Sequence, residues 1–225
     1  MIKRLEWDSN FFEMEIGELF YKQQLNIEDV IKYHLLYVKG NEDFEAIIPN
    51  FTNSFSEIKV VFAKKLKTKG YMFNNIFSCD ELTYNIKDLY KLAFESGKNS
   101  RFNLDKKFSR KKFEELYTKW IDNSINKKFA DDVFIYQENK VSLGFVTFKV
   151  YANFATIGLI AVDPSSQGKG IGSKLIDAVE EKVIDLGINI LQIPTQLENK
   201  SACSFYKKKE YSIEKITFIK HFWKN

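Results

Sequence analysis

Three glycines at alternate positions constrain the fold of this chain more than any other feature. Gly168, Gly170 and Gly172 follow an apolar run that ends at Val162, and they precede a long helical pattern. Glycine has no Cβ, so the backbone can turn tightly and approach a ligand closely there. Successive N–H groups at the start of a helix favour a phosphate or pyrophosphate. The sequence therefore predicts a strand, an anion-binding turn and a helix in direct succession.

Two other glycine-rich phosphate sites do not fit this segment. A Walker loop needs two glycines separated by four residues and followed by Lys-Ser or Lys-Thr, and that pattern is absent. A dinucleotide fingerprint needs a third glycine three positions after the second, where this chain has Ser173, and no acidic residue ends the following strand. A tight strand-to-helix turn without a ligand remains as the structural alternative.

Apolar periodicity predicts the other helices and strands. Helices are predicted over residues 27–38, 87–95, 109–121, 170–186 and 199–208. Strands are predicted over 16–21, 45–48, 57–65, 133–136, 143–151, 155–162 and 188–194, with the final strands in 212–223. Asn26 is the expected cap of the first helix, and Gly187 the expected C′ residue of the long helix. Because a helix joins strands 155–162 and 188–194, these two should run parallel in a mostly antiparallel sheet.

The chain is predicted to have two parts. Residues 1–75 form a smaller N-terminal α/β domain on the substrate side, and residues 76–225 form the domain that contains the glycine turn. The 34 basic and 30 acidic residues give a net charge of +4, which is a mild excess. Such a surface suits a small anionic ligand, whereas a nucleic-acid binder has a denser basic stripe. We therefore expect a small-molecule substrate and no nucleic-acid partner.

The cysteines and the first residues predict a cytoplasmic protein. Cys79 and Cys203 have neither metal-type spacing nor the number that a disulfide framework needs, so reduced thiols and no metal are expected. Charged residues occupy the start of the chain, where a signal peptide needs an apolar run. No stretch approaches the length of a membrane span, so no membrane association is expected.

Two motifs in the last third of the chain resemble the GNAT acyltransferase superfamily. Residues 167–172, Gln-Gly-Lys-Gly-Ile-Gly, fit its Gln/Arg-x-x-Gly-x-Gly/Ala signature, and the preceding residues 159–164 are similar to its fourth strand. Residues 199–206, Asn-Lys-Ser-Ala-Cys-Ser-Phe-Tyr, resemble its Asn-x-x-Ala-x-x-Phe-Tyr segment. The resemblance implies the α/β (α+β) GNAT fold, in which a mixed sheet has two splayed parallel strands. It also implies that acetyl-CoA binds in the gap between them as the co-substrate.

The resemblance identifies the residues expected to bind the donor. They are Ile160, Ala161, Val162, Gln167, Gly168, Lys169, Gly170, Ile171, Gly172, Ser173, Asn199 and Tyr206. The glycine turn would hold the pyrophosphate, and a backbone N–H near Ile160 or Val162 would polarise the thioester carbonyl. Asn199 would cap its helix and also hold the pantetheine arm. The family often has Gly-Phe a few residues after its tyrosine, where this chain has Glu210 and Tyr211, which puts the geometry of that turn in doubt.

Tyr206 is the candidate general acid. A phenol with a pKa of about 10 stays protonated at neutral pH and can donate to a departing thiolate. A packing role between helix and sheet is the alternative for Tyr206. His221 is a candidate base, with a structural role for it, or a water chain to solvent in its place, as alternatives. Cys203 is not expected to be a nucleophile, because direct transfer needs no acyl-enzyme.

Further segments resemble the TDP-fucosamine acetyltransferase group. They are residues 5–12, 95–105, 195–196 and 221–223. The resemblance implies an acceptor amine on a nucleotide-linked 4-amino-4,6-dideoxy sugar, a role in surface-polysaccharide synthesis, and a homodimer. Arg101 is then a candidate for pairing with a nucleotide phosphate, Asp105 for contacting sugar hydroxyls, and Gln196 for a further substrate contact. Another small amine, a peptide N-terminus, or acyl-CoA binding without turnover remain as alternatives.

Overall fold

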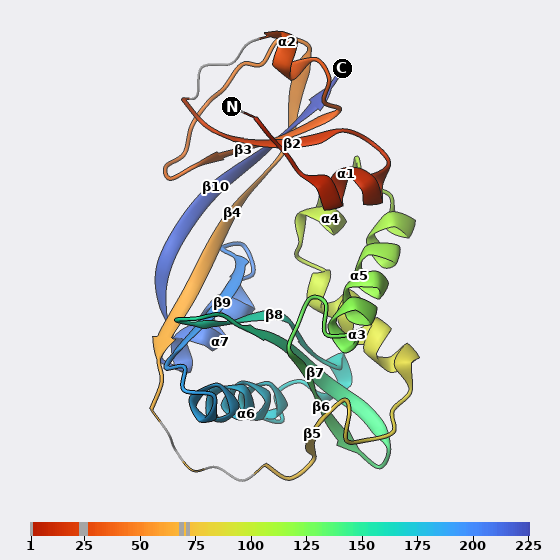
Figure 1. Cartoon of the computed structure of the whole chain (residues 1–225), viewed down its shortest axis with the longest axis vertical. Helices are drawn as coiled ribbons and strands as arrows, with labels where there is room; N and C mark the ends of the chain where they lie inside the picture. The colour runs from red at the N-terminus through yellow and green to blue at the C-terminus, as the bar shows by residue number, and fades with distance from the viewer. Residues whose placement is uncertain (1, 23–26, 68–69, 71–72) are drawn as a thin grey trace.

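A ten-stranded mixed sheet runs through the residues that the computed structural model describes, which are 2–22, 27–67, 70 and 73–225 (Figure 1). The strands are β1 (Lys3–Arg4), β2 (Ile16–Phe20), β3 (Leu35–Gly40), β4 (Phe51–Lys65), β5 (Ile76–Ser78), β6 (Asp132–Glu138), β7 (Val141–Val150), β8 (Ala155–Val162), β9 (Ile190–Gln196) and β10 (Ser212–Lys224). The helices are α1 (Glu6–Phe12), α2 (Ile27–Val30), α3 (Ile86–Gly97), α4 (Arg101–Leu104), α5 (Arg110–Ile125), the 3₁₀ turn η1 (Pro164–Ser166), α6 (Ile171–Asp185) and α7 (Lys200–Lys208).

The strand order is β1-β2-β3-β10-β4-β9-β8-β7-β6-β5. Strands β8 and β9 pair in parallel, as the connecting helix α6 predicted, and β2 and β3 form a second parallel pair. The other described pairs are antiparallel. This is the mixed α/β sheet that the sequence predicted.

Strands β4 and β10 connect the two ends of the sheet. They lie side by side and run from β3, in the upper part of Figure 1, to β9, just below its middle. The last strand, β10, lies between β3 and β4, so the first 65 residues and the final strand share one hydrogen-bonded sheet. The division of the chain near residue 75 remains a prediction.

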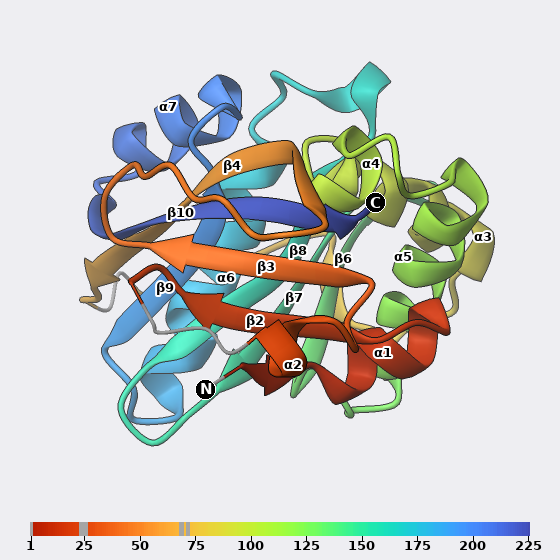
Figure 2. The same ribbon diagram turned by 90° about the horizontal axis from the view of Figure 1, so that it is seen from above.

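Helices cover both faces of the strands that hold the glycine turn. One apolar cluster joins α3 and α5 to β6, β7 and β8 through side chains such as Leu89, Phe113 and Phe145. A second cluster packs α6 and α7 against the other face, where Val146 meets Leu175. Figure 2 shows α3, α4 and α5 gathered on one side of the molecule and α7 on the other. The strands are thus held from both sides, which fixes the turn that follows β8.

Two predicted elements near the N-terminus are wrong. The helix expected over 27–38 ends at Val30, and Leu35–Gly40 forms strand β3 instead. The run from Leu35 to Val38 is wholly buried between β2 and β10, and such a continuous apolar run fits a buried strand as well as a helix. The strand expected over 45–48 is absent, and Ile48 instead packs into an apolar cluster from an irregular segment. The expected cap Asn26 lies outside the described residues.

The long helix α6 begins and ends where the glycines predicted. Gly170 is its N-cap, and Gly187 lies just past its end with a φ of 80°. Glycine adopts this left-handed conformation without the steric cost that a Cβ imposes. Within the described residues, no helix combines the length and the apolar character that a membrane span requires.

Candidate functional site

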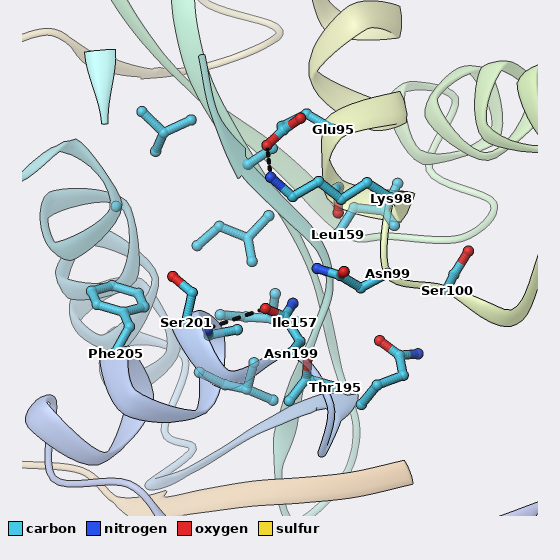
Figure 3. A pocket seen from close by; sticks show the side chains of 18 of the residues that line it. Glu95, Lys98, Asn99, Ser100, Ile157, Leu159, Thr195, Asn199, Ser201 and Phe205 are labelled. Carbon is cyan, nitrogen blue, oxygen red and sulfur yellow. Dashed lines mark hydrogen bonds and ion pairs between the residues drawn. The ribbon is translucent and has the colours of Figure 1, made fainter. Parts of the chain in front are cut away.

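The two parallel strands separate soon after they meet. Their register includes only Ala155 with Leu191 and Thr156 with Gln192. Beyond these pairs, β8 and β9 diverge, and a cleft of about 650 Å³ lies between them. Figure 3 shows Ile157 and Leu159 of β8 inside this cleft, with Ser201 and Phe205 of α7 on one side and Lys98 and Asn99 on the other.

The glycine turn forms one end of the cleft. Gly168 and Gly170 both have a φ of 79°, and a Cβ built on either would meet no heavy atom within 4 Å. As the N-cap, Gly170 supplies no side chain, so the N–H groups in the first turn of α6 stay available to a ligand. The Gln167 side-chain amide donates a hydrogen bond to the Val162 carbonyl at 3.2 Å, which ties the turn to the end of β8. This geometry suits an anionic group such as a diphosphate.

Strand β8 turns alternate N–H groups toward the cleft. The N–H of Asp163 donates to the Leu143 carbonyl of β7 at 2.8 Å. Because backbone groups alternate along an antiparallel strand, the N–H groups of Ile160 and Val162 point the other way, toward the side from which β9 has departed. Those are the two positions at which the sequence predicted a donor for a thioester carbonyl.

Helix α7 presents the second predicted motif to the same cleft. The Asn199 side chain accepts a hydrogen bond from the Ala202 N–H at 3.3 Å, so it caps the helix as expected. Tyr206 lies two turns further on, lines the cleft and packs its ring against Phe62 with centroids 5.6 Å apart. Burial raises the pKa of the Tyr206 phenol above its ordinary value, which keeps the hydroxyl protonated.

Most of the predicted site residues line this cleft. They are Arg101, Ile160, Ala161, Val162, Gln167, Gly168, Gly170, Ile171, Gly172, Ser173, Gln196, Asn199 and Tyr206. Lys169 belongs to the glycine turn and is exposed, and Lys169, Asp105 and His221 do not line the cleft. The donor residues predicted from the last third of the chain therefore lie together, while two of the acceptor-side candidates lie elsewhere.

Asp105 and His221 form a buried pair that does not line the cleft. Asp105 is 2% exposed and His221 is 0% exposed, so neither side chain is presented to a ligand. The His221 Nδ1 lies 2.6 Å from the Asp105 carboxylate, which also accepts a hydrogen bond from the Trp223 indole at 3.0 Å. These contacts favour the structural alternative for His221 and replace the expected contact between Asp105 and sugar hydroxyls.

The buried histidine should make the protein less stable in mild acid. Burial lowers the pKa of His221 to about 4, although Asp105 opposes the shift. Between these two pKa values the unfolded chain, with a histidine pKa of about 6.5, binds a proton at this residue and the folded state does not. Stability should therefore fall as the pH drops from 6.5 to 4, by about 3 kcal/mol from this group. Urea unfolding at several pH values should show this slope, and His221→Asn should flatten it. An unchanged slope in the variant would contradict the assignment.

Sequence reasoning missed a carboxylate on the opposite wall, Glu57 of β4. Glu57 is 6% exposed, lines the cleft, and has one oxygen, Oε2, with no hydrogen-bond partner among the described residues. Its Oε1 lies 3.7 Å from Nη1 of Arg101. Burial raises the pKa of Glu57, while Arg101 and then Lys59 act against the shift. Two charged residues at alternate positions of an apolar strand, Glu57 and Lys59, were the sequence signal for this wall.

The family of the chain follows from its sequence together with this geometry. Residues 85–211, more than half of the chain, match the Acetyltransferase (GNAT) family. The chain belongs to the GNAT acetyltransferase family. It is therefore an acyl-CoA-dependent acyltransferase, and the fold predicted from its motifs is confirmed.

Two curated proteins are similar to this chain in sequence. An uncharacterised N-acetyltransferase of Methanocaldococcus jannaschii is 26% identical over 191 residues, which cover 72% of this chain and 83% of the relative. The spore coat polysaccharide biosynthesis protein SpsD of Bacillus subtilis is 25% identical over 133 residues, 59% of this chain. The match spans 46% of SpsD, about half of its length.

Solved structures share the GNAT fold at low sequence identity. The PaiA N-acetyltransferase of Thermoplasma acidophilum, solved in complex with coenzyme A, has a TM-score of 0.51 and 21% identity, covering 65% of this chain and 97% of PaiA. A conserved protein of unknown function from Staphylococcus epidermidis has a TM-score of 0.60 and 12% identity, covering 94% of this chain and 84% of that protein. At these identities the likeness establishes the fold alone.

Proposed function

We propose that this GNAT enzyme transfers the acetyl group of acetyl-CoA to the amine of a nucleotide-linked amino sugar. One observation carries the proposal: a single cleft is lined by the glycine turn, by Tyr206 and by the buried carboxylate of Glu57. An anion site, a proton donor and a proton acceptor are the three groups that a direct transfer from a thioester to an amine needs.

The donor half of the reaction uses the turn and strand β8. The N–H groups after Gly170 would hold the diphosphate of the donor. The N–H of Ile160 or Val162 would bond the thioester oxygen and stabilise the charge that develops on it. When the C–S bond breaks, the Tyr206 hydroxyl would give its proton to the thiolate of coenzyme A.

The acceptor half needs a neutral amine, and Glu57 is the proposed base. An amine arrives as an ammonium ion near neutral pH, and it must lose a proton before its lone pair can attack the carbonyl carbon. The unpartnered Oε2 of Glu57 would take that proton before the lone pair attacks. The second proton of the amine, lost after the C–N bond has formed, balances the proton that Tyr206 gives to the thiolate. His221, the base considered from the sequence, is buried away from the cleft. Glu57, whose pKa burial raises, lines the cleft and is therefore better placed than His221 to accept the proton.

The amino-sugar acceptor is supported by two likenesses and by the chemistry of the wall. SpsD, a relative with a polysaccharide biosynthesis name, and the segments similar to the TDP-fucosamine group both favour a sugar substrate. Gln196 and Arg101 line the acceptor side and offer hydrogen bonds to hydroxyl or phosphate oxygens.

A panel of acceptors tests the proposal directly. Coenzyme A release should be measured with acetyl-CoA and a set of TDP- and UDP-linked amino sugars, with polyamines and short peptides as comparison amines. We expect turnover with at least one 4-amino-4,6-dideoxy sugar nucleotide and no comparable turnover with peptides. Turnover of peptides or polyamines alone would overturn the sugar proposal. No turnover with any amine, despite coenzyme A binding, would indicate a binding module instead.

A further inference from the structure

Unsatisfied polar atoms gather around Arg101, and three of their residues, Glu57, Ser100 and Arg101, line the cleft. In the described part of the chain, six buried side-chain polar atoms have no hydrogen-bond partner, and five belong to residues around Arg101. They come from Tyr37, Glu57, Ser100, Arg101 and His221. A buried polar atom without a partner costs about 1–3 kcal/mol, so a group of them marks a place where polar ligand atoms or water belong.

The Arg101 guanidinium lies beside the Glu57 carboxylate but does not hydrogen-bond to it. The guanidinium stacks on the rings of Tyr37 at 4.5 Å and Phe102 at 5.2 Å, which fixes its position. Its Nη1 is 3.7 Å from the Glu57 carboxylate, too far for a hydrogen bond. The positive charge of Arg101 opposes the rise in the pKa of Glu57 that burial causes. The buried Oε2 of Glu57 lacks a hydrogen-bond partner among the described residues, and the acceptor ammonium would supply one.

Lys59 adds a second positive charge, beside that of Arg101, near this carboxylate. It lies two positions after Glu57 on β4, lines the same cleft and is opposite Gln196 of β9. Its side chain is exposed, and among the described residues its ammonium forms no ion pair or hydrogen bond. Desolvation and then the charge of Arg101 lower the pKa of this ammonium, and Lys39 and Lys215 act in the same direction, while Glu57 opposes the shift. An anion in the cleft would relieve the repulsion among these positive charges.

The distance between the Glu57 carboxylate and the Lys59 ammonium indicates how far apart the charged groups of the ligand lie. Alternate residues of a strand project to the same face about 7 Å apart. An ammonium held by Glu57 and an anion held by Lys59 would therefore be separated by several bonds. A sugar that carries an amine on one side of its ring and a diphosphate on the other has this shape.

We propose that Lys59 is the residue that selects an anionic acceptor, by binding the diphosphate while Glu57 receives the amine. This inference rests on the proposed function for the position of the amine. The chemistry that Lys59 recognises is an anion, and a carboxylate on the acceptor itself is the other source of that charge.

Binding without turnover tests the selection by Lys59. Isothermal titration of thymidine diphosphate into the protein saturated with coenzyme A should give at least tenfold weaker binding for Lys59→Met than for the native protein. Lys59→Arg, which keeps the charge, should recover most of the affinity. Lys215→Met is the matched control, because Lys215 is exposed, lies near Lys59 and does not line the cleft. Its affinity should stay within about twofold of native, since an exposed charge outside the cleft is screened by water and salt.

A kinetic comparison separates this inference from the proposed function. Lys59→Met should lower kcat/KM at least tenfold, through KM, for a TDP-linked amino sugar, and leave the methyl glycoside of the same amino sugar unchanged. Equal effects on both acceptors, or native-like thymidine diphosphate binding by the variant, would overturn the inference. If Lys59→Met weakens activity only with amines that carry a carboxylate, Lys59 does select an anionic acceptor, but the anion that it binds is not a diphosphate. Failure of every amino sugar would instead defeat the proposed function, and the binding result would still decide the role of Lys59.

Discussion

Replacement of Tyr206 by phenylalanine is expected to lower kcat by about 10²–10³-fold and to leave coenzyme A affinity within about twofold of native. The change removes only the hydroxyl, so the ring can keep its contact with Phe62. Without that proton, the thiolate would have to leave as an anion in a buried part of the cleft, which is unfavourable. Steady-state coenzyme A release and calorimetry of coenzyme A binding measure the two quantities.

A second tyrosine provides the control for this prediction. Tyr151 is 44% exposed on the turn between β7 and β8 and does not line the cleft. Tyr151→Phe should keep native kcat and the native unfolding midpoint. If Tyr206→Phe also retains native kcat, its hydroxyl takes no part in the reaction and Tyr206 is a packing residue.

Replacement of Glu57 by glutamine is expected to lower kcat/KM at neutral pH by about 10²-fold. The amide keeps the shape of the side chain and cannot accept the ammonium proton. Activity of the variant should recover as the pH rises, because a growing fraction of the acceptor amine is then neutral without a base. The native enzyme should lose activity in acid as Glu57 protonates, and this limb should lie above the ordinary pKa of a glutamate because burial raises the pKa.

Glu198→Gln is the matched control for the carboxylate. Glu198 lies near enough to raise the pKa of Glu57, yet it is exposed and does not line the cleft. Its removal should shift the acid limb slightly downward and leave the plateau unchanged. A pH profile of Glu57→Gln that is parallel to the native one, with an acid limb still present, would assign the proton transfer to another group.

The glycine turn was predictable because the information for it is local. Gly168 and Gly170 need a left-handed backbone, Pro164 ends the strand, and the helix begins at once. Each of these constraints acts within ten residues of sequence. Local sequence therefore predicts the strand–turn–helix order and the cap at Asn199, and the helix that follows predicts the parallel pair.

The place of Glu57 in the acceptor wall was not predictable because distant segments build that wall, whereas Arg101 and Gln196 were predicted only through a resemblance. Glu57 reaches the cleft only through the pairing of β4 with β9 and β10, and Arg101 comes from a short helix between α3 and α5. Nothing in the sequence near Asp105 shows that His221 and Trp223, more than a hundred residues later, occupy its carboxylate. The error at residues 35–38 has the same origin, because neighbouring strands decide whether an apolar run becomes a helix or a strand.

The position of β10 between β3 and β4 has a consequence for how the chain folds during synthesis. Strand β3 can pair with β2, and β4 with β9, before β10 is made, but the edges of β3 and β4 that face β10 stay unpaired until residues 212–224 are synthesised. Until then both strands expose unpaired edges, which are sites of misassociation. The part of the sheet that carries Glu57 is therefore completed last, when β10 pairs with β4.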